Sequence, residues 1–169
     1  MTLNDLTSQF VSLMNNGLLK NNTALQTTFI TQAILRIQRE LRAPLQEATI
    51  LYTIPSTYSA TTGLAIPNDF LELIALNAGV NQEYELTRGN YSRVKDMAVN
   101  WPLGNPESFC RLGANWIIGP SPVAGDTLMI QYYASFPALV NPTDTNTLLS
   151  VAWDASAVRS ALCGLRLLQ

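Results

Sequence analysis

The stretch from Asn115 to Leu139 constrains the fold most, because it holds two strand patterns on either side of a turn-rich linker. Trp116-Ile117-Ile118 is a short apolar run, and the linker at 120–126 contains two prolines and a Gly-Asp pair. From 128 to 136 the residues alternate between two faces, and the apolar face consists of Leu128, Ile130, Tyr132, Ala134 and Phe136. Pro137 ends this strand, because proline has no N–H to donate to a neighbouring strand. We predict a β-hairpin that pairs residues 116–118 with residues 128–136.

A second hairpin is predicted upstream, between residues 45–54 and 64–66, with a polar loop at 55–63. In its first strand Ala48, Ile50, Tyr52 and Ile54 point one way, and Thr49, Leu51 and Thr53 point the other way. Further strands are predicted at 70–76, 84–86 and 109–112. Thr87 is the predicted N-cap of a short helix that runs to about Val99, and a loop rich in proline and glycine follows it.

Helical spacing of apolar residues marks both ends of the chain. Residues 3–13 predict a short helix that Gly17 ends, and residues 25–41 predict a longer helix that Pro44 ends. The predicted buried stripe of the longer helix is Leu25, Phe29, Ala33, Ile37 and Leu41, widened by Ile30 and Ile34. Its opposite face holds Gln38, Arg39 and Leu35. After Ser150, a last amphipathic helix is predicted from Val151, Ala155, Val158, Leu162 and Leu165.

These elements predict an α+β fold. It consists of N-terminal helices, a central, mostly antiparallel β-sheet or sandwich of hairpins with one short inserted helix, and a C-terminal amphipathic helix. With 169 residues, 47% of them hydrophobic, the chain is long enough to bury the core of one domain. We divide this single domain, 1–169, into a helical part at 1–43, a β-rich part at 45–139 and a C-terminal helix at 150–169.

The composition favours a surface that becomes buried against neighbouring molecules. Charged residues make up 13% of the chain, against roughly 25% in typical soluble domains, and uncharged Thr, Asn, Ser and Gln take their place. A modestly charged monomer is the alternative. The net charge of −2 indicates no general attraction to nucleic acid. The sequence shows neither a secretory signal nor a run of roughly 18 apolar residues, so no membrane span is predicted.

The sequence predicts no enzyme, no cofactor and no metal site. Histidine is absent, which excludes Ser-His-Asp and Cys-His nucleophile arrangements and removes the commonest zinc ligand. The carboxylate pairs Glu83/Glu85 and Asp69/Glu72 are more typical of a solvated surface than of catalysis. Cysteines occur only in a predicted strand and a predicted helix, and we expect both to be small buried hydrophobes: Cys110 and Cys163.

The order of several short motifs resembles the head-to-tail adaptor (head–tail connector) family of tailed bacteriophages. The motifs are P-x-P, G-D, Y-Y, F-P-x-L and T-N-x-L-L, which here are Pro120, Pro122, Gly125, Tyr132, Tyr133, Phe136, Pro137, Leu139, Thr145, Asn146, Leu148 and Leu149. Residues 66–73 and 37–42 also resemble the family, so the motifs cover most of the chain in the family's order. Family members usually continue beyond this point, so a truncated or short C-terminal end is expected at Gln169.

The resemblance implies a structural virion protein that is made in the host bacterial cytoplasm and lies at the capsid–tail junction. Copies of the chain would form a ring, twelve-fold like the portal, between the portal protein and a downstream tail or nozzle protein. Genomic DNA would pass through the lumen without specific binding, which the acidic net charge suits. Neither a cofactor nor a membrane is implied as a partner.

The resemblance also places portal docking on the C-terminal helix. The candidate docking residues are Val158, Arg159, Leu162, Leu165 and Arg166. The candidate contacts with neighbouring subunits or the tail are Leu35, Arg39, Thr57, Tyr58 and Trp101. Alternatively, Leu35 is a lone exposed leucine, Arg39 simply compensates the helix dipole, and Arg159 and Arg166 belong to a solvated face. Trp116 is assigned to the core.

Two other functions fit the sequence. One is a stopper or tail-completion protein of the same neck region. The other is a free-standing β-rich binding module or small enzyme that uses the sheet face or the Glu83/Glu85 region. The second alternative predicts a stable monomer with a concave pocket for a small molecule.

Overall fold

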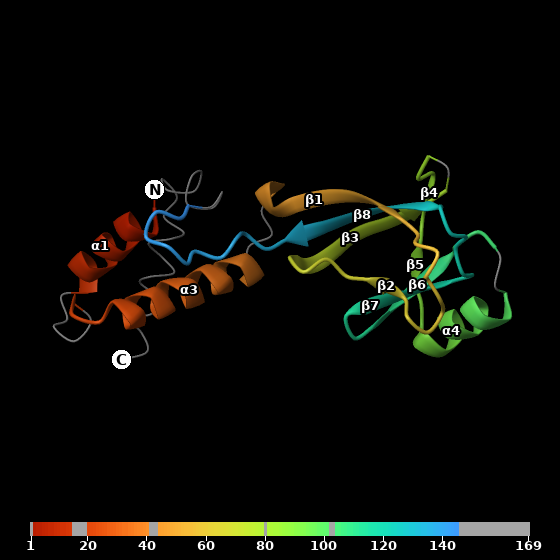
Figure 1. Ribbon diagram of the computed structural model, residues 1–169, viewed down its shortest axis with the longest axis horizontal. Helices are drawn as coiled ribbons and strands as arrows, with labels where there is room; N and C mark the ends of the chain where they lie inside the picture. Colours follow the sequence, from red (N-terminus) through yellow and green to blue (C-terminus); the bar gives the residue numbers. More distant parts are fainter. Residues whose placement is uncertain (1, 15–19, 41–43, 80, 102–103, 146–169) are drawn as a thin grey trace. The chain divides into compact units, whose positions relative to one another are not determined.

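The computed structural model describes residues 2–14, 20–40, 44–79, 81–101 and 104–145 (Figure 1). The chain forms two compact units, Met1–Gln46 with Ser135–Gln169, and Glu47–Ala134. Within these described residues, the first unit is mainly helical, and the second contains eight strands and one helix. The predicted α+β fold with mainly antiparallel sheets is confirmed. The predicted single domain, 1–169, with parts at 1–43, 45–139 and 150–169, stays a prediction.

In the first unit, α1 (Leu3–Met14) packs on α3 (Thr23–Glu40), and a 3-10 turn, η1 (Pro44–Gln46), follows. A capping box starts α1: the Asp5 N–H donates to Thr2 Oγ1 at 3.3 Å, and the Thr2 N–H donates to Asp5 Oδ2 at 2.9 Å. The core of this unit consists of Leu3, Leu6, Phe10, Ile30 and Leu139. The predicted helix stop at Gly17 lies outside the described residues.

The buried face of α3 differs from the predicted stripe. The buried residues are Gln26, Ile30, Ala33, Ile37 and Gln38, whereas Leu25 is exposed and Phe29 is half-buried. The placement of Leu25 in the stripe and of Gln38 on the opposite face is therefore wrong. A glutamine can bury its methylene groups when its amide finds a partner, as the Gln26 amide does by donating to the Lys20 carbonyl at 3.4 Å. Leu41 lies outside the described residues.

In the second unit, four antiparallel strands form sheet A in the order β1 (Glu47–Thr53), β8 (Thr127–Ala134), β3 (Phe70–Ala78) and β4 (Tyr84–Glu85). The alternation predicted for β1 and β8 is confirmed. On β1 exposed and half-buried residues alternate, and on β8 the buried residues are Leu128, Ile130 and Tyr132. The first strand begins later than predicted, because η1 occupies residues 44–46.

Sheet B has the order β2 (Leu64–Ala65), β7 (Asn115–Gly119), β6 (Ser108–Leu112) and β5 (Thr87–Arg88). Among the described strands, only β5 and β6 pair in parallel. The connection between β6 and β7 is a true hairpin, and it turns at Gly113, whose φ of +62° lies in the left-handed region that favours glycine.

Both predicted hairpins are wrong in their strand pairing. β1 and β8 lie in sheet A, whereas β2 and β7 lie in sheet B, so neither predicted pair shares a sheet. The linker at 120–126 carries the chain from sheet B to sheet A instead of folding it back on itself. The physical reason is that the two strands need different surroundings: β7 is buried along most of its length between β6 and β2, whereas β8 alternates between buried and half-buried residues between β1 and β3.

The helix α4 (Tyr91–Asn100) covers the outer face of sheet B (Figure 1). Its buried residues Val94 and Ala98 pack against Cys110 and Ile117. Its N-cap is Asn90, whose Oδ1 accepts the Ser92 N–H at 2.9 Å, so the predicted cap at Thr87 is wrong. Thr87 instead lies in β5. The buried position predicted for Cys110 is confirmed, and Cys163 lies outside the described residues.

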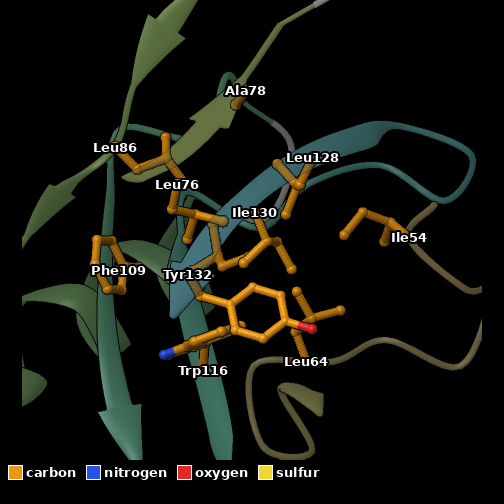
Figure 2. Packing of buried hydrophobic residues seen from close by; sticks show 11 residues of the cluster. Ile54, Leu64, Leu76, Ala78, Leu86, Phe109, Trp116, Leu128, Ile130 and Tyr132 are labelled. Carbon is orange, nitrogen blue, oxygen red and sulfur yellow. The ribbon is translucent and has the colours of Figure 1, made fainter. Parts of the chain in front are cut away.

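The main core lies between the two sheets (Figure 2). Its buried residues are Ile54, Leu64, Leu76, Ala78, Leu86, Phe109, Trp116, Ile118, Leu128, Ile130 and Tyr132. Trp116 is 2% exposed, which confirms its assignment to the core, and the Phe70 ring packs edge-on against it with centroids 5.3 Å apart. The second unit is therefore a sandwich of two sheets with α4 as a third layer.

Candidate functional site

The exposed side of α3 carries two of the predicted contact residues, Leu35 and Arg39, one helical turn apart. Leu35 is 38% exposed, and Arg39 is exposed as well. Beside them Arg36 and Glu40 form an ion pair of 2.7 Å, in which both side chains are more than half exposed, so the pair adds little stability. This face offers a partner one apolar side chain among charged ones.

The loop that carries Thr57 and Tyr58 is held against sheet B. The Tyr58 hydroxyl accepts the Ile118 N–H at 3.1 Å and donates to the Ile118 carbonyl at 3.4 Å. Burial raises the pKa of Tyr58 above its ordinary value of 10.0. Tyr58 therefore anchors the loop within the chain, whereas Thr57 is exposed. Their roles as contacts with a partner stay predictions.

Trp101 lies directly after α4, and its side chain is 59% exposed. Val99 is 53% exposed, so the end of this helix presents two large apolar side chains. The loop at 55–63 lies nearby, because Ala60 packs against the cluster that joins α4 to sheet B. The structure thus brings the loop and the helix together on the outer side of sheet B.

The outer face of sheet A is a surface that the sequence reasoning did not single out. Leu51 is 64% exposed there, and it lies opposite the half-buried Met129 on β8. The next pair along these strands is Thr49 and Gln131. The predicted alternation at 48–54 already placed Leu51 away from the core, which was the available signal. Uncharged side chains therefore occupy the middle of this face.

One hollow, of about 320 Å³, opens between the β3–β4 turn and the start of β8. It is lined by Gly79 and Tyr84 on one side and by Gly125 and Asp126 on the other. Burial, followed by the negative charge of Asp126 and nearby glutamates, raises the pKa of Tyr84 above 10.0, so its phenol is neutral at pH 7. The Asp126 carboxylate already accepts the Val123 N–H at 2.9 Å. These two groups form no acid–base pair of the kind that catalysis uses.

One member of each predicted carboxylate pair accepts a local hydrogen bond. The Tyr132 hydroxyl donates to Asp69 at 3.1 Å, and the Asn81 amide donates to Glu83 at 3.4 Å. Among the described residues, no three His, Cys, Asp or Glu side chains are grouped so that they could hold a metal ion. In the same part of the chain, no helix has the length and hydropathy that a membrane span requires.

The candidate docking residues at the C-terminal end lie outside the described residues: Val158, Arg159, Leu162, Leu165 and Arg166. Their role stays a prediction. A comparison with curated proteins finds no match to the chain. A family model described as SU10 adaptor protein matches residues 1–164, which is nearly the whole chain. This match confirms the resemblance drawn from the motif order, and the chain therefore belongs to the SU10 adaptor protein family of phage head-to-tail adaptors, which makes it a structural component of the virion neck.

Proposed function

We propose that the protein forms a ring that joins the capsid portal to the tail and continues the channel for DNA. Membership of the adaptor family supplies the neck role and the association with phage head and tail proteins. The proposal adds a twelve-fold ring, docking of the C-terminal helix at 150–169 on the portal, and contact with a downstream tail or nozzle protein. We further propose that the protein is made in the host cytoplasm and has no enzymatic activity.

The observation that carries this proposal is the outer face of sheet A. Leu51 is 64% exposed on it, between Thr49 and Thr53 on the same face of β1. An exposed apolar side chain among uncharged polar ones is typical of a protein interface, whose centre is depleted in charge. Only 13% of all residues are charged, which extends the same character to the whole chain.

A ring also agrees with the physics of the neck. Identical subunits joined head to tail close into a ring when each contact adds the same rotation, and closure prevents open fibres. A net charge of −2 per subunit would let DNA slide through the lumen, because few Lys and Arg side chains are available to hold its phosphates. The hollow beside Tyr84 offers no chemistry that would favour an enzyme instead.

The test is to mix the purified protein with portal rings of the same phage and to image the mixture by negative-stain electron microscopy. We expect a new ring of density at one end of the portal, with matching symmetry. The triple variant Val158→Asp, Leu162→Asp and Leu165→Asp should leave the portals bare. The matched control is the double variant Ser156→Asp and Ser160→Asp, which adds charge to the other side of the predicted helix and should still dock.

Three results would contradict the proposal. If the triple variant docks as strongly as the double variant, the C-terminal helix is not the part of the chain that contacts the portal. Binding to the tail component alone, with bare portals, would identify a stopper or tail-completion protein. A monomer that binds neither component but takes up a small molecule would identify a binding module.

A further inference from the structure

In the described part of the two sheets, β1 is the long open edge with a regular register. β4 pairs only with Asn77 and Ala78, so residues 70–75 of β3 are open on that side as well, but the register of β3 with β8 shifts twice there. Sheet A ends in β1 and β4, and sheet B ends in β2 and β5. The strands β2, β4 and β5 have two residues each, whereas β1 has seven. Proteins usually blunt such edges with short strands, bulges, lysine or proline. β1 contains neither lysine nor proline, and its register with β8 runs without a shift.

Hydrogen bonds beside β1 show which of its backbone groups face outward. The Ile54 N–H donates to the Asp126 carbonyl at 2.8 Å, and the Gly125 N–H donates to the Ile54 carbonyl at 2.9 Å. Backbone groups of alternate residues in a strand point to the same neighbour, so the even-numbered residues of β1 bond towards β8. The N–H and C=O groups that point away belong to Glu47, Thr49, Leu51 and Thr53. No described strand pairs with this edge.

The sequence of β1 is complementary to itself in one antiparallel register. When two copies pair about Ile50, all seven residues overlap and the outward-facing groups of each copy meet those of the other. Thr49 then lies opposite Leu51, and Glu47 lies opposite Thr53. The one charged residue of the strand therefore meets an uncharged one, and the two Glu47 side chains lie at opposite ends of the joint. Leu51, 64% exposed in one chain, gains a neighbour on its open side.

We propose that β1 pairs with β1 of a second copy of this chain, antiparallel and centred on Ile50, before the protein joins the neck. Such a joint has two-fold symmetry, so it closes on itself and cannot continue around a ring. The pair covers the open edge in the free protein, and a ring built through the same edge would require it to separate. The inference does not rest on the proposed ring, since it concerns the purified chain alone.

The first test measures the mass of the free protein in solution by light scattering during size-exclusion chromatography. We expect about twice the 18.5 kDa of one chain. Thr49→Pro removes an outward N–H without removing a bond to β8, so it should give monomers with an unchanged circular dichroism spectrum. Thr49→Val keeps the N–H and should remain dimeric. If Thr49→Pro does not fold, Leu51→Lys serves instead, because it leaves the backbone intact and adds the charge that normally protects an edge.

The second test fixes the register by disulfide trapping in a chain with Cys110→Ala and Cys163→Ala. Ile50→Cys should cross-link two copies, because residues on the two-fold axis are directly opposite and within disulfide range. Thr53→Cys is the control: its two copies would lie about 20 Å apart and should stay reduced. Monomeric wild-type protein, a dimeric Thr49→Pro variant, or equal trapping at both positions would overturn the proposal. A ring-sized assembly that Thr49→Pro disperses would also overturn it, in favour of head-to-tail pairing.

Discussion

Removal of the Tyr58 hydroxyl provides a sharp test of how the loop at 55–63 is held. β2 pairs with Trp116 and Asn115 but extends no further along β7. The next backbone groups on that side of β7, those of Ile118, bond instead to the Tyr58 hydroxyl, at 3.1 Å and 3.4 Å. One side chain thus takes the place of a missing strand neighbour. Tyr58→Phe removes this partner and leaves the ring itself unchanged.

The expected cost follows from the burial of Ile118, which is 0% exposed. Its N–H would lose the hydroxyl and could not reach water, so the penalty is that of a buried unsatisfied donor, about 1–3 kcal/mol. With a urea m-value of roughly 2 kcal/mol per molar, the unfolding midpoint should fall by about 0.5–1.5 M.

Urea unfolding of the wild type and the variant, followed by tryptophan fluorescence, measures this cost, because Trp116 lies in the core beside Ile118. Tyr91→Phe is the matched control, since Tyr91 lies on the exposed side of α4 and its contact with Lys95 is through the ring. This control should change stability by less than about 0.5 kcal/mol. Equal midpoints for the two variants would refute the view that the hydroxyl replaces a strand neighbour.

The loss of stability at alkaline pH tests the same role of Tyr58 independently. Burial raises the pKa of Tyr58 in the folded protein above 10.0, the value expected for the unfolded chain. The unfolded chain therefore releases its phenol proton first, so the associated stability is complete below pH 10 and is lost as the pH rises through the folded pKa. The pKa values of Tyr84 and Tyr132 are raised too. Tyr58→Phe should thus show a smaller alkaline loss of stability than the wild type, measured by the urea midpoint between pH 9 and pH 11.

Two further predictions concern backbone packing. Gly119→Ala should destabilise the fold by about 1–3 kcal/mol in urea unfolding, because the new β-carbon would lie 2.6 Å from the Val94 carbonyl oxygen; an unchanged midpoint would contradict this close approach. Asp144→Ala should speed amide exchange at Leu3. The Leu3 N–H donates to the Asp144 carbonyl, and the Asp144 carboxylate holds the turn that presents this carbonyl. The control Asp126→Ala, which removes a similar cap elsewhere, should leave exchange at Leu3 unchanged. Hydrogen bonds from backbone N–H groups lower the pKa of Asp144 below 3.8, so this stabilisation is complete above that pH and is lost as the pH falls below it.

The sequence was most informative where one face of an element meets water. The strands β1 and β8 show the period-2 pattern of half-buried strands, and the structure confirms which residues of each point inward. The short helix after β5 is predicted from Tyr91, Val94, Met97 and Ala98, and all of these except Tyr91 are buried. Its N-cap was misplaced, because Thr87 and Asn90 are both good caps and only pairing with β6 assigns Thr87 to a strand.

Strand pairing could not be derived from the same patterns. Hairpins were predicted from closeness in sequence, but β1, β3 and β8 share one sheet while β2 and β7 share the other. A signal was present in Trp116-Ile117-Ile118, because three apolar residues in a row predict a strand that is covered on both faces. β8 alternates instead. Two strands with such different surroundings do not have the matched faces that the two arms of an ordinary hairpin share.

The functional surfaces were the hardest to predict, for a physical reason. A catalytic or metal site requires particular residue types at particular spacings, and the lack of histidine could be weighed at once. An assembly surface requires only shape and a low density of charge, which Thr, Gln and Leu provide in many arrangements. Leu51 illustrates this: its outward direction follows from the sequence, but the open edge on which it lies appears only when the order of strands is known. For an adaptor, strand order therefore carries functional information that motifs alone lack.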